Sequence, residues 1–428
     1  MTKTQTKANL PWLGVIADDY TGASDVAGTL VDAGMRVMQT FGIPDPSRQL
    51  HDVDCIVVSL KTRSVPAAEA VEESLAAALA LKSHGVRQLY FKYCSTFDST
   101  PEGNIGPVAD ALRKEFVPAG QITVVAPGTP ALRRTVYNGV LFAGTDLLQE
   151  SSMRNHPLTP MTDSSVPRLL QAQTENLVGH IGYTVIEAGA PAVQSQFRTL
   201  SGEGTGYAVV DTLSDRHLAV LGAAVLDHPL VTGGSGLVGG MAVARGVKVQ
   251  PESARAARPA GPAAVVAGSC SEMTNVQIDT FRQFRPCFLM DPVAIAEGHD
   301  VVAEALLFAR ENLADGPVLI HSTASPQDVS RAQRQLGQAR AAEITEESLS
   351  TIAEGLVGLG CRQLIVAGGE TSGAVVRKLG ITTAHVGKEV SPGVPWLKTE
   401  TDPGLSILLK SGNLGMPGLF LDAWDHNR

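Results

Sequence analysis

Short apolar runs alternate with longer amphipathic stretches through the first half of the chain. Runs of about five apolar residues between turn formers are typical of buried strands, and longer Ala- and Leu-rich stretches are typical of helices. The clearest helix lies within Pro66–Gly85, because proline suits a first helical turn and glycine a helix end. The alternation predicts a mainly parallel sheet with helices on both faces. Strands are expected at Leu13–Ala17, Val37–Phe41, Cys55–Ser59, Gln88–Lys92, Ile122–Ala126 and Tyr207–Asp211.

A second set of elements follows a stretch without apolar periodicity. Residues 245–262 are rich in Ala, Arg, Pro and Ser and are interpreted as a linker. A chain of 428 residues exceeds one ordinary core, so we expect domains at 1–244 and 263–428. The predicted fold class is two α/β domains, each a mainly parallel sheet flanked by helices, with the active site in the interdomain cleft. The second set comprises strands at Ala263–Ala267, Cys287–Met290, Pro317–His321, Gln363–Ala367, Thr383–Val386 and Leu405–Leu409, and helices at Ala303–Ala314 and Glu346–Leu359.

Composition narrows the class of protein. Hydrophobic residues make up 44% and charged residues 18%, as in a soluble globular enzyme. The net charge of −9 is spread along the chain without a basic stripe, so nucleic acid is not an expected partner. No apolar run approaches the ~18 residues of a membrane span, and the first nine residues do not resemble a secretory signal. Five scattered cysteines without CxxC spacing predict a reduced, cytoplasmic protein without structural zinc.

The densest group of candidate catalytic residues is the run GVIADDYTGASD. Asp18 and Asp19 follow the first predicted strand directly, and Thr21 comes two residues later. The carboxyl ends of parallel strands are where open α/β sheets bind ligands. Adjacent carboxylates are costly unless a cation, a ligand or backbone donors share their charge. The alternative is a plain strand followed by an Asp that caps a helix.

A second polar group lies in the loop after the strand at Gln88–Lys92. Hydroxyl, amide and carboxyl side chains at this density suit a polyhydroxylated ligand. A polar surface loop with Ser and Thr turns is the alternative interpretation. The candidate substrate contacts in this loop are Ser95, Thr96, Asp98, Ser99 and Asn104.

Two further loops offer cationic or imidazole contacts. Arg133 and Arg134 follow the strand at Ile122–Ala126, and the planar guanidinium suits a carboxylate or phosphate. One of the two, Arg134 by preference, is expected to hold an acid group or the moving phosphoryl group. His156 lies in a Pro-flanked loop, where a ligand contact is more plausible than on a helix face.

Three small-residue loops end strands of the second half. GSCSEMTNVQI begins at Gly268, AGGETSGA at Ala367 and LKSGNLG at Leu409. Backbone amides in such loops can hold phosphate oxygens, and Glu370 could reach a metal-bound water. Together the three loops predict a nucleotide site.

A fourth glycine-rich segment, VTGGSGLVGG, contains the pattern GxGxxG at Gly234, Gly236 and Gly239. The dinucleotide fingerprint also needs an acid at the end of a second strand about 20 residues on. The sequence RGVKVQPESARAARP found there does not predict such a strand. A nicotinamide-dependent dehydrogenase stays a distant alternative, and glycines needed only for packing are another.

Several of these segments occur in order in one known family. The strings GVIADDYTGASDVA, SLKTRS, YFKYCSTFDSTPEGNIGPV, LVTGGSGL, GSCSEMTNVQ, VAGGETSGAVV and LKSGNLG resemble the four-carbon acid sugar kinase family from Leu13 to about Gly415. Small departures are Tyr20, Ser24 and Leu414, where the family pattern suggests Phe, Thr and Phe.

The resemblance implies an ATP-dependent kinase with an N-terminal acid-sugar domain and a C-terminal nucleotide domain. It implies phosphorylation of the C4 hydroxyl of 3-oxo-tetronate, with Mg²⁺ accompanying ATP. Threonate or erythronate as substrate, a non-catalytic sugar-acid sensor and a homo-oligomeric state stay open. SLKTRS adds Lys61 and Arg63 to the substrate contacts. The implied nucleotide contacts are Ser269, Gly368, Gly369, Glu370, Thr371 and Gly412, and the protein ligands of the metal are unknown.

Overall fold

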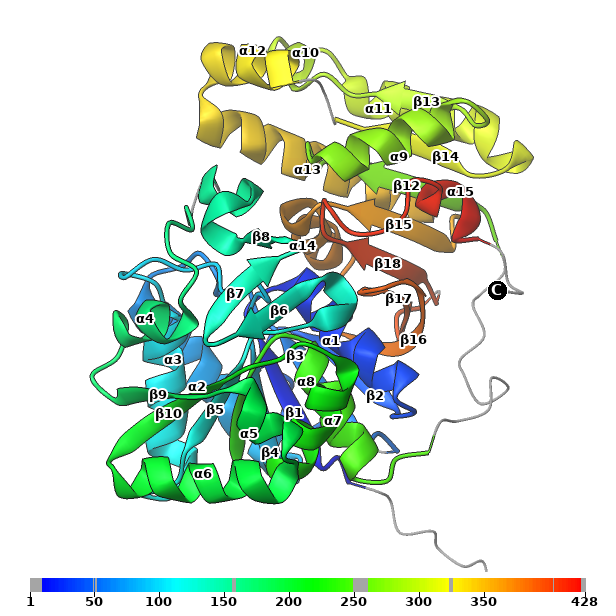
Figure 1. The fold of residues 1–428 in the computed structure, drawn as a ribbon. Coiled ribbons are helices and arrows are strands. Elements are labelled where there is room, and N and C mark those ends of the chain that lie inside the picture. Colours follow the sequence, from blue (N-terminus) through cyan, green and yellow to red (C-terminus); the bar gives the residue numbers. More distant parts are fainter. Residues whose placement is uncertain are drawn as a thin grey trace, which may run out of the picture. The chain divides into compact units, whose positions relative to one another are not determined.

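The computed structural model describes residues 10–48, 50, 52–155, 159–248, 261–322, 326–402 and 404–424. The chain divides into two compact units, Met1–Glu252 and Ser253–Arg428. Each unit is an α/β domain built on a mainly parallel sheet flanked by helices, so this part of the predicted fold class is confirmed (Figure 1).

The sheet of the first unit has the strand order β2-β3-β1-β4-β11-β5-β10-β9, and every neighbouring pair is parallel. The first four strands coincide with the predicted ones, whereas β9 and β11 were not predicted. The strand bounds are β1 (Leu13–Ala17), β2 (Val37–Phe41), β3 (Cys55–Ser59), β4 (Gln88–Lys92), β5 (Thr123–Ala126), β9 (Leu177–Ile181), β10 (Thr205–Val210) and β11 (Leu230–Gly233).

Helices cover this sheet in two groups. The crossovers β1→β2 and β3→β4 run in opposite directions, and right-handed crossovers of opposite direction place helices on opposite faces. Helix α2 (Ala67–Ser83) packs on α3 (Ile105–Phe116), whereas α1 (Tyr20–Asp32) packs on α8 (Gly236–Ala244), which packs on α7 (Asp215–Ala224). The remaining helices are α4 (Val166–Gln171), α5 (Tyr183–Glu187) and α6 (Ala190–Gly202). The direction of the crossovers reverses at β1, which makes its carboxyl end the expected ligand-binding position.

A small antiparallel sheet interrupts the alternation. Strands β6 (Arg134–Tyr137), β7 (Val140–Ala143) and β8 (Asp146–Leu147) form it, and Val136 bridges to Thr212 beside the main sheet. It was not predicted, because its strands are short and contain exposed polar residues.

The sheet of the second unit has the order β13-β14-β12-β15-β18-β17-β16. Its strands are parallel except for the pairs β16–β17 and β17–β18. Only the start of the antiparallel hairpin was predicted, because its sequence mixes charges with glycine and proline. The strand bounds are β12 (Ala263–Ala267), β13 (Cys287–Leu289), β14 (Val318–His321), β15 (Gln363–Ala367), β16 (Thr383–Ser391), β17 (Val394–Thr399) and β18 (Ser406–Lys410).

The helices of the second unit begin at residues that suit helix starts. Ser271 caps α9 and Asp300 caps α11, each accepting a hydrogen bond from a backbone amide three residues on. Helix α13 starts eight residues before the predicted start at Glu346. The prediction missed these first turns because they are largely polar and exposed. The bounds are α9 (Glu272–Arg282), α10 (Pro292–Ala296), α11 (Val301–Asn312), α12 (Pro326–Leu336), α13 (Gln338–Gly358), α14 (Gly369–Lys378) and α15 (Leu419–Asp422).

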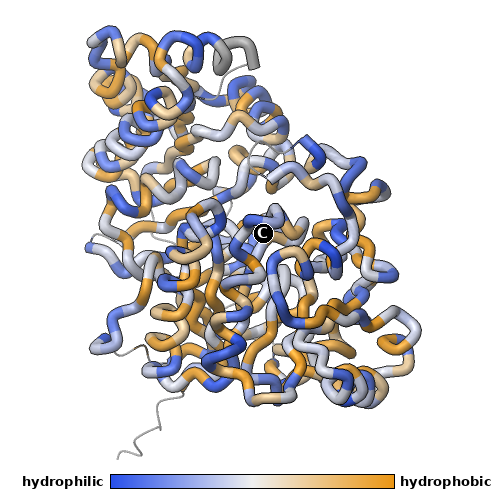
Figure 2. Tube along the Cα trace, turned by 90° about the vertical axis from the view of Figure 1, so that its left-hand side faces the viewer, coloured by the Kyte–Doolittle hydropathy of each residue, from blue (hydrophilic) through white to orange (hydrophobic). Residues whose placement is uncertain are grey.

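Apolar burial holds each unit together. One hydrophobic core of the first unit joins strand residues such as Ile16 and Phe91 to Leu81 of α2 and Leu112 of α3. The core of the second unit joins β12, β15 and β18 to Phe281 of α9 and to α15. In Figure 2 the strands are mostly hydrophobic while the helices alternate in hydropathy, as expected when one helix face is solvated. Among the described residues, no helix is long and apolar enough to cross a membrane.

Candidate active site

Asp18 and Asp19 lie at the carboxyl end of β1, between β3 and β4. The amide of Asp18 donates to Lys92 O, and Asp18 O accepts from the amides of Thr62 and Arg63. The three strands are in parallel register, with Ala17 opposite Ser59 and Lys92. The sheet therefore brings together three segments that lie far apart in the sequence.

Arg63 binds both carboxylates. Its Nε donates to Asp18 Oδ2 at 2.9 Å and its Nη2 to Asp18 Oδ1 at 2.7 Å. The same Nη2 donates to Asp19 Oδ1 at 2.7 Å. A guanidinium fork shared by two carboxylates supplies the cation that adjacent aspartates need.

Asp19 also begins helix α1. Its backbone is extended, Oδ1 accepts from the amide of Gly22 at 2.8 Å and Oδ2 from Thr21 Oγ1 at 2.7 Å. A side chain at residue 22 would overlap Asp19 Oδ1 and lie 3.1 Å from Lys92 Nζ. Glycine is therefore required for this cap, and Asp19 has the structural role that the sequence left open beside a catalytic one.

The two aspartates differ electrostatically. Burial raises the pKa of Asp18 above its ordinary value although Arg63 opposes it, and the side chain is only 5% exposed. Burial acts in the same direction on Asp19, but Arg63 and Lys92 together hold the pKa of its carboxyl below the ordinary value. Asp18 is thus the better proton acceptor of the pair.

Lys92 and Asp25 extend the charged cluster behind the cap. Lys92 is buried; its Nζ donates to Tyr93 O at 3.0 Å and lies 3.8 Å from Asp25 Oδ2. Burial raises the pKa of Asp25, and Lys92 opposes the rise. These two residues were not selected from the sequence, although Lys92 ends a predicted strand and Asp25 ends the run GVIADDYTGASD.

The loop after β4 is anchored by a strained aromatic residue. Phe97 has φ +51°, an unusual conformation for a bulky side chain, and it is completely buried. Its ring packs edge-on against Tyr93 at a centroid distance of 5.3 Å. Burial of the ring stabilises the loop shape that carries Ser95, Thr96 and Asp98 past the end of β4.

Several predicted contacts in this region support neighbouring backbone or side chains. Asn104 Nδ2 donates to Thr62 O at 2.6 Å and to Val65 O at 3.1 Å, so it holds the segment that carries Arg63. Ser99 Oγ accepts from Gln173, and Thr96 Oγ1 lies 2.8 Å from Cys94 Sγ. Ser95, Asp98 and Lys61 are half-buried.

Two other predicted contacts come from elsewhere. Arg134 starts β6, and its Nη1 donates to Leu132 O at 3.3 Å and to Arg133 O at 3.4 Å, within its own turn. His156 lies outside the described residues.

The GxGxxG segment serves helix packing. A Cβ at Gly240 would overlap Leu218 O, and one at Gly222 would overlap the backbone of Gly240. A Cβ at Gly236 would lie 2.9 Å from Gly128 O. The glycines of this stretch thus allow α8 to approach α7 and the loop after β5 closely.

The three predicted nucleotide loops meet at the carboxyl ends of β12, β15 and β18. The amide of Gly268 donates to Ala367 O, and that of Gly368 to Lys410 O. A Cβ at Gly412 would overlap Ser269 Oγ, and one at Gly268 would overlap Thr371 Oγ1. Gly368 has φ +123°, which favours glycine. The loops therefore touch through backbone and hydroxyl groups, as a phosphate-binding surface requires.

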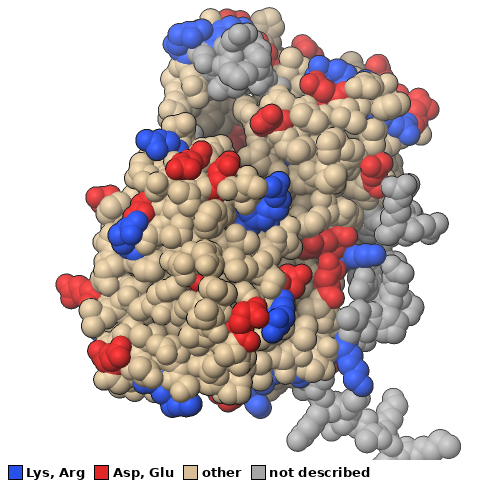
Figure 3. All heavy atoms as spheres, in the orientation of Figure 1, with Lys and Arg blue, Asp and Glu red and all other residues tan. Residues whose placement is uncertain are grey.

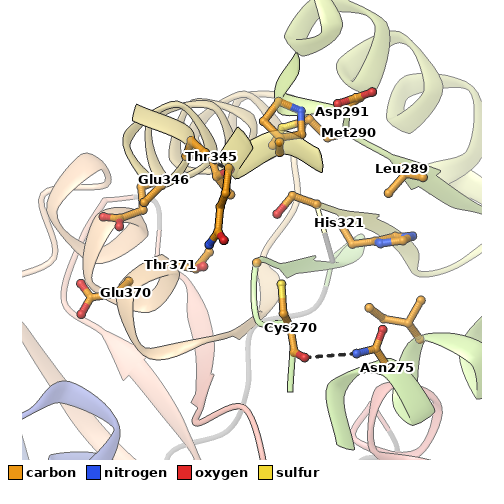
Figure 4. A pocket seen from close by; sticks show the side chains of 18 of the residues that line it. Cys270, Asn275, Leu289, Met290, Asp291, His321, Thr345, Glu346, Glu370 and Thr371 are labelled. Carbon is orange, nitrogen blue, oxygen red and sulfur yellow. Dashed lines mark hydrogen bonds between the residues drawn. The ribbon is translucent and has the colours of Figure 1, made fainter. Parts of the chain in front are cut away.

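A cavity of about 610 Å³ opens beside these loops. Gly268 and Thr371 line it from the predicted nucleotide loops, and helices α9, α12 and α13 together with the ends of β13 and β14 line most of the rest (Figure 4). His321 lies at the end of β14, 3.4 Å from Arg282 through Nε2 and Nη2. This volume suits a nucleoside-sized ligand. Polar and charged lining residues include Asn275, Arg282, Asp291, His321, Arg331, Thr345, Glu346 and Glu370.

Family models match both units. One described as a sugar-binding N-terminal domain matches residues 13–241, and one described as a nucleotide-binding C-terminal domain matches residues 264–420. A protein from Burkholderia multivorans named 3-oxo-tetronate kinase is 49% identical over 418 residues, 96% of this chain and 96% of that protein. Proteins of the same name from Cupriavidus necator and Salmonella typhimurium are 46% and 44% identical, over 98% and 96% of this chain and 98% of each relative.

This chain belongs to the four-carbon acid sugar kinase family. It is accordingly an ATP-dependent phosphotransferase, and the dehydrogenase and sensor alternatives are set aside.

Solved structures share the fold of this kinase. A crystal structure from Salmonella typhimurium LT2, which bears a provisional description as a tRNA synthase, matches with a TM-score of 0.88 and 43% identity. The match covers 96% of this chain and 98% of that one. A crystal structure from Haemophilus influenzae matches with a TM-score of 0.79 and 43% identity, covering 95% and 98%.

The face of the kinase drawn in Figure 3 shows acidic and basic residues interspersed. Within the described ranges, no three His, Cys, Asp or Glu side chains are grouped so as to hold a metal ion.

The sequence analysis did not select Lys410, Asp291 or His321. His321 ends a predicted apolar strand, and Lys410 ends the observed strand β18.

Proposed function

We propose that this enzyme transfers the γ-phosphoryl group of ATP to the C4 hydroxyl of 3-oxo-tetronate. The observation that carries the substrate assignment is the identity of 43–49%, over nearly the whole chain, to relatives named 3-oxo-tetronate kinase. The charged cluster at the end of β1 and the glycine loops of the second unit support the reaction type, because phosphoryl transfer needs positioning and charge neutralisation more than covalent chemistry.

The first unit supplies the acid-sugar site in this proposal. Arg63 binds two carboxylates of the protein, and 29% of its side chain remains exposed. We expect this exposed part to orient the substrate carboxylate. Asp18 accepts the proton of the C4 hydroxyl group while the C4 oxygen of the substrate attacks the γ-phosphorus. The bond between the γ-phosphorus and the oxygen that bridges it to the β-phosphate breaks in the same step. Asp19 holds Arg63 and the start of α1 in place.

Other predicted contacts keep their proposed roles around this core. We expect Thr21, Lys61 and the loop residues Ser95 and Asp98 to surround the hydroxyl groups of the substrate. Thr96, Ser99 and Asn104 are bonded to protein groups and shape the pocket, and Arg134 and His156 stay predictions for the carboxylate or the phosphoryl group.

The second unit supplies the nucleotide site. The phosphates are placed against the amide of Gly369 and the turn at Gly412, with Ser269 and Thr371 donating through their hydroxyls. Gly368, whose own amide donates to Lys410 O, contributes a backbone without a side chain that a phosphate can approach closely. The nucleoside is placed in the cavity lined by His321. Glu370 lies in the first turn of α14 and is exposed, so its carboxylate fits a water of the Mg²⁺ that travels with ATP. The ion supplies charge neutralisation between the phosphates.

Some properties are carried over from the sequence as proposals. We keep domain bounds of 1–244 and 263–428 around a linker at 245–262, with the reaction in the cleft between the domains. A cytoplasmic location and a homo-oligomeric state are likewise predictions, tested by fractionation and by light scattering.

A substrate panel tests the function. Purified enzyme is given ATP, Mg²⁺ and, separately, 3-oxo-tetronate, D-threonate, L-threonate and D-erythronate, and ADP release is coupled to an optical signal. We expect the highest kcat/KM with 3-oxo-tetronate and a product whose phosphorus signal couples to the C4 protons. A preference for threonate or erythronate would make the enzyme a threonate or erythronate kinase of the same family and would overturn the substrate assignment. No ADP release with any C4 acid would overturn the whole proposal.

A further inference from the structure

Lys410, the last residue of β18, is a completely buried cation. Its Nζ donates to Thr274 Oγ1 at 2.9 Å, to Gln277 Oε1 at 2.6 Å and to Gly412 O at 2.9 Å. All three ammonium donors are used, and all three acceptors are uncharged. The hydrogen bonds are therefore satisfied, but none of these described partners neutralises the charge.

The described residues of the elements around Lys410 supply no counter-ion. Helix α15 contributes the ring of Phe420, with Nζ 5.5 Å from its centroid, and β15 contributes Ala367 in register with Lys410. Within the described part of the chain, no carboxylate lies within 4.0 Å of Nζ. A buried charge in this situation is costly. Lys398 of β17 lies opposite Ser406, away from this end of β18. The charged residues of α9, α14 and α15 are all exposed, namely Glu272, Asp279, Arg282, Glu370, Arg377, Lys378 and Asp422.

The ammonium group orients one peptide of the nucleotide loop. Gly412 O accepts from Lys410 Nζ and from Thr274 Oγ1, both at 2.9 Å. Because the peptide bond is planar and trans, the N–H of Asn413 points in the opposite direction, away from the lysine. Gly412 itself leaves no room for a side chain beside Ser269 and Ser271. Lys410 thus lies behind the turn and directs an amide outward.

We infer that Lys410 is the buried counter-charge for the phosphates of the nucleotide, a positioning residue that shapes the Gly412 turn and takes up a proton from solvent when ATP binds. The inference rests on the proposed nucleotide site. It adds to that site a cation that does not touch the ligand, together with a dependence of ATP affinity on pH.

The direction of the coupling follows from burial. Burial lowers the pKa of Lys410 to about 7, so near neutral pH only part of the ligand-free enzyme carries the charge. Bound phosphates favour the charged form and raise this pKa. Each unit of rise strengthens ATP binding about tenfold in the protonated enzyme relative to the neutral one. We therefore expect ATP affinity to fall as pH rises from about 7 to 9.

Calorimetry of the full chain measures the proton directly. Mg²⁺ and a non-hydrolysable ATP analogue are titrated into the enzyme at pH 7.5 and 8.5, in buffers that differ in ionisation enthalpy. The wild type should take up a fraction of a proton per nucleotide. Lys410→Met should lose this uptake and bind the analogue at least tenfold more weakly, with KM for ATP rising more than kcat falls. Lys378→Met, which removes an exposed lysine at the far end of α14, should behave as the wild type.

A variant that stays charged and an NMR titration of the wild type complete the test. Lys410→Arg stays charged at every pH, so it should retain binding without pH dependence. Should neither variant fold, isotope-labelled lysine side chains in the wild type can be followed by NMR. One lysine should titrate near pH 7 without nucleotide and well above it with the analogue.

The outcomes separate the two proposals. A wild type that binds no analogue overturns the nucleotide site itself. A wild type that binds, with Lys410→Met equal to it in affinity and proton uptake, overturns only the role of Lys410. The absence of any lysine that titrates near neutral pH overturns it as well.

Discussion

Arg63 meets Asp18 across 45 residues of sequence through both arms of its guanidinium fork, at 2.9 and 2.7 Å. The same guanidinium reaches Asp19 at 2.7 Å. One cation therefore holds the two acids together at the end of β1, and both the stability and the activity of this edge of the sheet depend on it.

Replacement of Arg63 should lower the free energy of unfolding of the enzyme. Arg63→Gln leaves Asp18 buried without its partner, which costs about 3–5 kcal/mol. Arg63→Lys keeps a charge without the fork and should cost less while still reducing kcat. Urea unfolding of both variants measures the difference. Arg168→Gln, which breaks an exposed pair with Asp163, is the control and should change stability little. An Arg63→Gln variant as stable as the wild type would contradict this assignment.

The two aspartates should separate catalysis from stability. Asp18→Asn should lower kcat by ~100-fold or more with a small change in KM, because the proton acceptor is lost. Asp19→Asn retains the helix cap and should reduce kcat less. Asp19→Ala removes the cap and should cost about 1 kcal/mol of stability.

Steady-state kinetics and thermal unfolding of these three variants measure both effects. Normal turnover in Asp18→Asn would reject Asp18 as the base, and a larger loss of kcat in Asp19→Asn would move the role to Asp19.

Gly369 tests the approach of a phosphate to the backbone. A Cβ there meets nothing within 4 Å, so Gly369→Ala should leave the fold intact and stabilise α14 by about 0.5–1 kcal/mol. The added methyl group should nevertheless obstruct the phosphate and raise KM for ATP about tenfold. Gly358→Ala, at the end of α13, also has open space and should change stability alone. Equal KM values in the two variants would place the phosphates elsewhere.

The cavity beside α13 should be the nucleoside site. Ala342 is exposed and lines this cavity, so Ala342→Trp should occupy part of the volume without disturbing the core. KM for ATP should rise at least tenfold, while KM for the sugar acid stays near its original value. Ala303→Trp, exposed on α11 outside the cavity lining, is the matched control. If both variants bind ATP normally, the nucleoside lies outside this cavity.

Lys410 should give the folded state a dependence on pH. The pKa of its side chain is about 7 in the folded enzyme, against an ordinary value of 10.5. Between these values the unfolded chain binds one more proton than the folded one, so stability rises with pH across this window. In Lys410→Met that contribution is absent. The difference in unfolding free energy should therefore shift in favour of the wild type between pH 7 and about 9. A constant difference would show that Lys410 keeps its proton.

Local sequence patterns predicted the strands at which both sites lie. The apolar run at Leu13–Ala17 followed by two acids, and the runs before GSCS and GGET, carry their own turn signals, so β1, β12 and β15 were found at their observed bounds. The short strands β6 and β8 were missed, because most of their residues are exposed or partly exposed and form no apolar run. Of the antiparallel hairpin β16–β17 only the start, at Thr383–Val386, was predicted, because its sequence mixes charges with glycine and proline.

The amino-acid sequence alone also identified the motif residues Asp18, Asp19 and Ser269, since residue type and position after a strand are local properties. Partner choice was decided by the tertiary structure. Arg63 reaches both acids only because β3 lies beside β1, and Lys410 becomes a buried, unneutralised cation only because α9 and α15 cover the end of β18. Burial and proximity arise from chain segments far apart in sequence, and these two quantities set the pKa values and the charge balance of a site.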